Sequence, residues 1–264
     1  MAASLQILFI CLAGYIGHIG EWMKEAVSLP GLRAKLVRME DAIILGLARR
    51  QEYCRNDAIY NPGEIRIKGF KGSFLDYLLI GREKLDRTAG RYDDPRELPF
   101  FKPSNEERIV QRSVEKQEIP PLKINKNPEI MQLYISIIKG LCRKGDDGEY
   151  GSSAIVDICN LQDISSRVHL GAFVAEAKWR MDNSLRRFAE RGEKENLKEA
   201  LRDRKVEEGI LERVEEKGKR YGLPRGIARD LYARGIIPLT IEVEVGYLIE
   251  KMGNSQREGL SAAT

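Results

Sequence analysis

The sequence is poor in the residues on which metal binding and covalent catalysis depend. Its 264 residues include two histidines, His18 and His169, and four cysteines. No two of the cysteines form a Cys-x-x-Cys pair, which argues against a zinc site. No serine or cysteine nucleophile motif accompanies His169, so we interpret this residue as a hydrogen-bonded core histidine rather than a ligand or a base.

An excess of one sign of charge is also missing. The chain carries 44 Lys and Arg against 40 Asp and Glu, and the two signs are interspersed. Even in the most charged stretch, residues 186–220, they are nearly balanced, which is typical of a solvated helical face. No basic block with interleaved aromatic residues is present, so a nucleic-acid partner is not expected.

No hydrophobic run of membrane-spanning length is evident. Residues 5–19 are mostly apolar, but this stretch is too short for a stable span. No Lys or Arg precedes it and its cleavage-site pattern is poor, so it is a weak match to a signal peptide. We interpret residues 1–25 as an N-terminal extension of a cytoplasmic protein, with secretion or organelle targeting through residues 1–20 as the alternative. Residues 26–256 would form one domain and residues 257–264 a flexible tail.

Apolar residues recur at helical spacing along most of the chain. This pattern predicts helices beginning near Pro30 and at Ser73, which is a candidate N-cap, and a third helix over 128–141. Residues 152–179 are interpreted as one long helix or two consecutive ones, and residues 184–221 as a further helical stretch. With 42% hydrophobic residues and no internal repeat, the chain is predicted to form a single all-helical domain.

One segment does not follow the helical pattern. Residues 239–247 alternate apolar and polar side chains and are rich in β-branched residues, which locally favours a strand. No other convincing strand exists to pair with it, and a lone strand cannot satisfy its backbone groups. Pro238 also fits the first turn of a helix. The pattern alone leaves both interpretations open.

Two isolated cations interrupt an otherwise small and apolar run. Arg167 and Lys178 are eleven positions apart, or about three helical turns, so both fall on one stripe with Gly171 and Val174 between them. A cation on an amphipathic helix is usually solvated, but these neighbours are apolar nearly all round and indicate a buried helix. A buried cation needs an anionic partner, either a protein carboxylate or a ligand. Two cations flanking a glycine-floored hollow suit a small anionic ligand.

Several longer motifs occur in a characteristic order over roughly residues 29–252. They are LVRMED at 36–41, GFKGSFLD at 69–76, PFF at 99–101, GDDG at 145–148, FVAEAK at 173–178, VEE at 206–208, IPLT at 237–240 and EVEV at 242–245. In these motifs the chain resembles the chorismate mutases of fungi and plants. The resemblance implies an all-α, dimeric protein, a single helical-bundle domain of roughly ten to twelve helices. It also implies a helix over residues 239–247.

The resemblance further implies the conversion of chorismate to prephenate, in phenylalanine and tyrosine biosynthesis. This pericyclic step needs no nucleophile, metal or cofactor. It needs a dianionic substrate held in a compact diaxial conformer and compensation for negative charge on the breaking ether oxygen. Positioning and preorganised electrostatics would therefore supply the acceleration.

The family's catalytic pattern matches individual positions of this chain. Lys178 matches the lysine that donates to the ether oxygen, and Glu244 the glutamate that must be protonated to share this oxygen. Glu207 matches the carboxylate that accepts the substrate hydroxyl, and Thr240 a hydroxyl donor near a substrate carboxylate. Thr240 and Glu244 are four positions apart, so a helix places both on one face.

The substrate's two carboxylates require further partners. Arg33 and Arg167 match the two carboxylate-binding arginines of the family. Asp203 stands where the fungal pattern has asparagine, and an ionised Asp203 would repel the substrate unless it is paired, with Arg202 or Arg204, or points away.

Regulated members of the family respond to tryptophan, which activates, and to tyrosine, which inhibits, at a site in the dimer interface. Gly151 and Ser152 resemble part of that site. The fungal arginine pair is reduced here to Gly90 and Arg91, so one arginine that could bind an effector carboxylate is missing.

Two alternatives from other functional classes remain. The first is a catalytically weak or inactive helical interaction protein, in one version secreted, that retains the fold. The second is a helical partner-binding protein in which Arg167 and Lys178 form internal ion pairs with Glu207 and Glu244.

Overall fold

The computed structural model describes residues 29–102, 108–110 and 119–261, with side chains described as far as residue 254. The interpretation of residues 1–25 concerns a segment outside the described residues. The described part is helical, and its only β-type pairing is two isolated bridges. This confirms the predicted all-α class. No described helix is long and apolar enough to cross a membrane.

The described residues form ten α-helices, α2 to α11. Their bounds are α2 Leu29–Arg50, α3 Phe74–Thr88, α4 Asn127–Leu141, α5 Tyr150–His169, α6 Gly171–Met181, α7 Asn183–Glu190, α8 Lys194–Leu201, α9 Arg204–Arg220, α10 Ile227–Leu231 and α11 Ile237–Ser261. Short 3-10 turns at Asp57–Ile59 and Arg91–Asp93 and a π-helical turn at Tyr232–Ile236 complete the described elements. The helix α11 ends at Ser261, within the segment 257–264 that the sequence analysis assigned to a tail.

Helix starts agree with the local sequence. Ser73 caps α3 as predicted, because its hydroxyl accepts from the Asp76 backbone amide while the Asp76 carboxylate accepts from the Ser73 amide. Pro128 occupies the first turn of α4, where the missing amide hydrogen costs nothing. These starts depend only on neighbouring residues, which is why the sequence located them.

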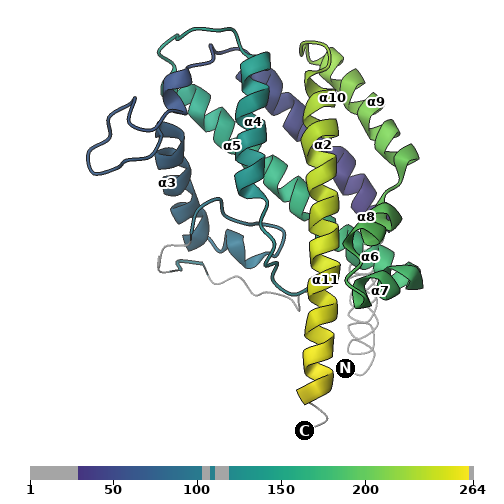
Figure 1. Cartoon of the computed structure of the whole chain (residues 1–264). Coiled ribbons are helices and arrows are strands. Elements are labelled where there is room, and N and C mark those ends of the chain that lie inside the picture. The colour runs from purple at the N-terminus through teal and green to yellow at the C-terminus, as the bar shows by residue number, and fades with distance from the viewer. Residues whose placement is uncertain (1–28, 103–107, 111–118, 262–264) are drawn as a thin grey trace, which may run out of the picture.

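The helix α5 lies at the centre of the molecule and packs most extensively against α2. Close approach of the two helices depends on Gly46, because a Cβ atom there would lie 1.7 Å from the side-chain oxygen of Asn160. The long helix α11 runs the length of the molecule, with α3 on one side and α7 to α9 on the other (Figure 1). This arrangement leaves α2, α5, α6, α9 and α11 in position to surround one cavity.

The helices α5 and α6 are consecutive and are separated only at Leu170. Leu170 keeps helical dihedral angles, φ −61° and ψ −15°, so the direction of the chain changes little. The position of Gly171 between Arg167 and Lys178 suggested that it forms the floor of a hollow, but it does not line the cavity. A Cβ atom there would lie 2.9 Å from both the carbonyl oxygen and a methyl carbon of Thr240, so this glycine lets α6 approach α11.

Two parts of the sequence pattern resolve only in the fold. Residues 239–247 are helical within α11, where Leu239, Val243 and Tyr247 are buried in the core and Thr240, Ile241 and Glu244 line a cavity. The stretch 184–221 is not continuous. It breaks at Gly192, which has φ +66°, and again between α8 and α9, where Asp203 caps the new helix.

Candidate active site

One cavity collects every residue to which the sequence assigns a catalytic or substrate-binding role. It has a volume of about 360 Å³. The residues that line it include the seven that the sequence singled out: Arg33, Arg167, Lys178, Asp203, Glu207, Thr240 and Glu244. They come from five helices and the turn before α9, so only the fold brings them together. The rest of the lining is mainly aliphatic, including Leu36, Val174 and Ile241.

Arg167 is a buried cation without a carboxylate partner in the described part of the chain. Its exposed fraction is 3%, and its Nε has no hydrogen-bond acceptor. Its Nη1 lies 3.5 Å from the Thr240 hydroxyl oxygen, a long contact. That hydroxyl donates instead to the Ile236 carbonyl at 2.6 Å, so Thr240 must reorient to donate to a ligand. Burial lowers the pKa of Arg167, which reflects the cost of a desolvated guanidinium.

Lys178 on α6 and Glu244 on α11 form an ion pair in the wall of the cavity. The Lys178 ammonium donates to Glu244 Oε2 at 2.8 Å and to the Leu201 carbonyl at 2.6 Å. Glu244 is 4% exposed. Burial raises the pKa of Glu244, although Lys178 and Arg167 oppose this shift. A carboxyl group with a raised pKa can stay protonated and donate one hydrogen bond, and the neighbouring ammonium can donate a second to the same acceptor atom.

The remaining predicted residues have partners of their own. The Glu207 carboxylate accepts two hydrogen bonds from the Arg202 guanidinium, at 3.2 and 3.0 Å. Asp203 pairs with neither Arg202 nor Arg204. Its carboxylate accepts from the Val206 backbone amide at 3.1 Å, so it caps α9 and is held at that helix's N-terminus.

Two further charged residues, Glu40 and Arg213, also line the cavity, and the sequence interpretation missed both. Glu40 on α2 is 1% exposed and accepts from Arg213 on α9 at 2.8 and 2.6 Å. Lys217 also donates to Glu40 at 3.2 Å. A signal for Glu40 was present, because it lies four positions after Leu36 and four before Ile44 on the apolar stripe of α2.

These pairings leave two guanidinium groups of the cavity without a carboxylate partner among the described residues. Glu40 and Glu207 are matched by Arg213 and Arg202, whereas Arg33 and Arg167 form no ion pair with any carboxylate that the structure describes. Two unmatched guanidinium groups fit a ligand with two carboxylates. The arrangement therefore suits a compact dianion.

His169 is a core histidine, as the sequence suggested. It is fully buried, and its Nε2 accepts from the Lys126 backbone amide at 3.0 Å. Its Nδ1 then carries the proton and donates to the Ser165 carbonyl at 2.8 Å. Burial lowers the pKa of His169 to about 4, so the ring is neutral near neutral pH.

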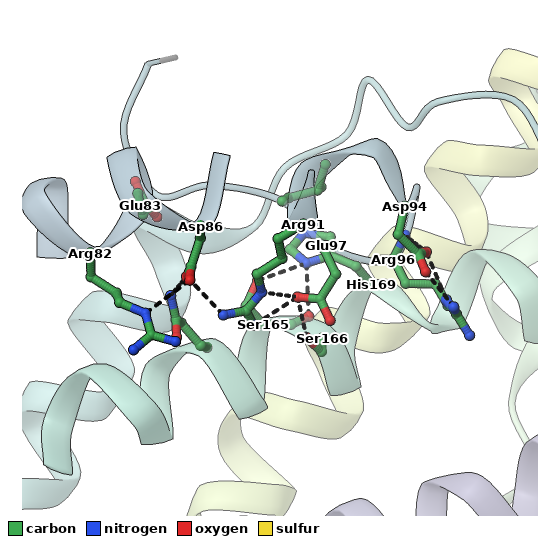
Figure 2. Close-up of polar contacts among 12 residues, drawn as sticks. Arg82, Glu83, Asp86, Arg91, Asp94, Arg96, Glu97, Ser165, Ser166 and His169 are labelled. Atoms are coloured by element: carbon green, nitrogen blue, oxygen red, sulfur yellow. Dashed lines mark hydrogen bonds and ion pairs between the residues drawn. The ribbon is translucent and has the colours of Figure 1, made fainter. Parts of the chain in front are cut away.

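The structure separates the residues expected at an effector site. Arg91 donates to Asp86 at 3.0 Å and to Glu97 at 3.1 and 2.9 Å, and Glu97 also accepts from the Ser166 hydroxyl (Figure 2). Gly151 and Ser152 begin α5, whereas Ser166 lies near its end, about 21 Å away along the axis. Arg91 therefore lies beside the C-terminal half of α5, whereas Gly151 and Ser152 lie at its start.

Known proteins are similar to this chain in sequence and in fold. The family model for chorismate mutase type II matches residues 150–245. The chain is 36% identical over 249 residues to chloroplastic chorismate mutase 1 of Petunia hybrida, covering 86% of this chain and 77% of that protein. The chloroplast chorismate mutase from Zea mays aligns with a TM-score of 0.81 at 34% identity, covering 86% of this chain and 96% of the other. The Candida albicans chorismate mutase in complex with L-tryptophan aligns with a TM-score of 0.82 at 30% identity, covering 86% and 93%. The chain belongs to the chorismate mutase family.

Proposed function

We propose that the cavity binds chorismate and converts it to prephenate. The observation that carries this proposal is Arg167, a buried guanidinium that no described carboxylate neutralises. In the proposed complex, Arg33 and Arg167 bind the two substrate carboxylates. Because both anchors lie on rigid helices, they favour the compact conformer in which the reacting carbons are close.

The reaction breaks one carbon–oxygen bond and forms one carbon–carbon bond within the same molecule, with no net proton transfer. Negative charge develops on the ether oxygen as its bond to carbon breaks. Lys178 and protonated Glu244 supply hydrogen bonds to that oxygen, and Glu207 accepts from the substrate hydroxyl. Lys178 and Glu244 lie side by side before the substrate enters, which supports a site that needs little reorganisation in the transition state.

The proposed roles explain why burial of Glu244 is useful. A carboxylate here would accept from Lys178 and repel the ether oxygen, whereas the protonated group donates. Burial already raises the pKa of Glu244, and a dianionic substrate would raise it further. We therefore expect an acidic working range.

Turnover of chorismate by the purified protein tests the proposal, followed by loss of chorismate absorbance. Arg167→Ala is expected to lower kcat/KM at least about a hundredfold, because an oriented charge in a desolvated site is lost. Arg187→Ala removes an exposed arginine on α7 and is the matched control. A wild-type chain without turnover, or equal activity in the two variants, would contradict the proposal.

The partner-binding alternative is only partly compatible with the observed contacts. Lys178 and Glu244 do pair internally, but Arg167 has no carboxylate partner among described residues and Glu207 pairs with Arg202. The inactive alternative is decided by the same turnover assay.

Our proposal for regulation and assembly is a homodimer that responds to tryptophan or tyrosine. An L-tryptophan complex is known for the Candida albicans relative. The separation of Arg91 from Gly151 and Ser152 supports an effector site shared by two chains. Exposed apolar side chains on α3 and α5, including Leu85 and Ile155, offer surface for such a contact. Sedimentation velocity and activity assays with each amino acid test both parts.

The proposed compartment is the cytoplasm. The Petunia hybrida relative is chloroplastic, so organelle targeting through residues 1–20 is the alternative. Determining the N-terminus of the native protein and its location in fractionated cells decides between them.

A further inference from the structure

Leu201, the last residue of α8, and Arg202 and Asp203, the two-residue turn before α9, all contact residues of the proposed site or of the helix that carries Glu207. The Leu201 carbonyl accepts from the Lys178 ammonium at 2.6 Å. The Arg202 guanidinium donates twice to Glu207, and Asp203 caps α9, the helix that carries Glu207. We propose that Arg202 is a positioning residue for the mutase reaction, which orients Glu207 toward the substrate hydroxyl and keeps it away from Lys178. This inference rests on the proposed function.

The geometry of the Arg202–Glu207 pair supports a positioning role. Nε lies 3.2 Å from Oε1 and Nη2 lies 3.0 Å from Oε2, so the planar guanidinium meets both carboxylate oxygens. Such a two-point contact fixes the rotation of the carboxylate as well as its place. Each oxygen keeps a second lone pair, which leaves Glu207 free to accept from a substrate hydroxyl. Arg202 does not line the cavity, so it acts on the substrate only through Glu207.

A freely moving Glu207 would harm the site, because several charged groups face the same space. Glu244 on α11 is faced by Lys178 from α6, Arg167 from α5 and Glu207 from α9. Without Arg202, the Glu207 carboxylate would be drawn toward the Lys178 ammonium and compete with the ether oxygen for it. Arg202 prevents this by offering a nearer cationic partner.

Arg202 also influences the protonation of Glu244 through Glu207. The negative charge of Glu207 raises the pKa of Glu244, after the larger effect of burial. The Arg202 cation partly cancels that charge. Removing Arg202 therefore raises the pKa of Glu244 further, and Glu244 stays protonated to a higher pH. A purely structural arginine would leave the pH profile unchanged.

The test compares Arg202→Ala with Arg204→Ala in the full-length protein. Arg204 lies at the start of α9 and pairs only with Glu199, at 3.4 Å on the surface, so its removal takes away the same charge without touching a site residue. Arg202→Ala is expected to raise KM for chorismate about tenfold, since a charge-assisted hydrogen bond loses its orientation. It is also expected to shift the alkaline limb of the activity–pH profile to higher pH. Arg204→Ala should match the wild type in both.

A double-mutant cycle isolates the route through Glu207. In a Glu207→Gln background, Arg202→Ala should change KM by less than twofold, because the carboxylate that Arg202 orients is already gone. Arg202→Lys keeps the charge but not the two-point contact, and should retain most of the KM defect with a nearly normal pH profile.

The outcomes separate this inference from the proposed function. Full turnover by the wild type with equal kinetics for Arg202→Ala and Arg204→Ala overturns the positioning role alone. An effect of Arg202→Ala on KM that persists in the Glu207→Gln background also overturns it. So does a KM effect that accompanies a loss of thermal stability with an unchanged pH profile. A wild-type chain without turnover overturns the proposed function and the positioning role with it.

Discussion

The ligand-free protein should become more stable when Arg167 loses its charge. Arg167 is 3% exposed, has an unsatisfied Nε and faces no described carboxylate within ion-pair distance. Arginine stays protonated in proteins, so this site holds a desolvated positive charge even when empty. Arg167→Met keeps an unbranched apolar stem and removes the charge.

The size of the effect follows from the cost of an uncompensated buried ion, which is several kcal/mol, less the attraction that Arg167 receives from the more distant Glu40 carboxylate. We expect Arg167→Met to gain about 1–3 kcal/mol of unfolding free energy, or roughly 3–10 °C in Tm. Arg50 provides a matched control. It is equally buried but lies 2.8 Å from Asp157, so Arg50→Met should lose about 3–5 kcal/mol by leaving that carboxylate unpaired.

The assay is chemical and thermal unfolding with and without a saturating dicarboxylate ligand. A ligand at a hundred times its Kd should stabilise the wild type by about 2.7 kcal/mol and leave Arg167→Met unchanged. The variant would therefore be the more stable protein when empty and gain nothing when ligand is added. A loss of more than about 2 kcal/mol in ligand-free Arg167→Met would refute the reasoning, because it would reveal a structural partner for this guanidinium.

Three other predictions concern single groups in or near the site. Activity should fall as pH rises through the raised pKa of Glu244, and Glu244→Gln should flatten this limb because an amide donates at every pH; an unchanged limb would exclude Glu244 as the titrating group. Asp203→Asn keeps an equally good N-cap and removes an anion from the cavity lining, so stability should stay within about 0.5 kcal/mol while KM for chorismate falls. Burial lowers the pKa of His169 from 6.5 to about 4. Between these two pH values the unfolded chain therefore binds a proton at His169 that the folded chain does not. Stability should accordingly drop by up to roughly 3 kcal/mol as pH falls from 6.5 to 4, and urea titrations of His169→Gln should lack this component.

Local features of the chain were predictable without a fold. The start of α3 at Ser73, the proline in the first turn of α4 and the paired spacing of Arg167 and Lys178 depend on residues within a few turns of one another. The ordered motifs of the chorismate mutases then identified residues that line one cavity, including Glu207, which has no distinguishing local context. Side-chain chemistry at fixed spacing is a property of sequence, so these inferences needed no coordinates.

The period-two pattern of residues 239–247 shows where such inference stops. Alternation normally reflects two faces of a strand, but here its polar positions belong to a helix in which Thr240 and Glu244 line a cavity while Glu242 is exposed and pairs with Lys126. Whether polar residues face solvent or a cavity depends on the neighbouring helices, which the local pattern does not contain.

The sequence by itself determined that this chain is helical and which side chains are suited to a dianionic substrate. Only the tertiary structure decided that Arg167 has no carboxylate partner in the described chain while Lys178 pairs with Glu244, 66 positions away. The physical reason is range. Helix formation and capping involve residues a few positions apart, whereas the charge balance of a cavity depends on segments that only folding brings together.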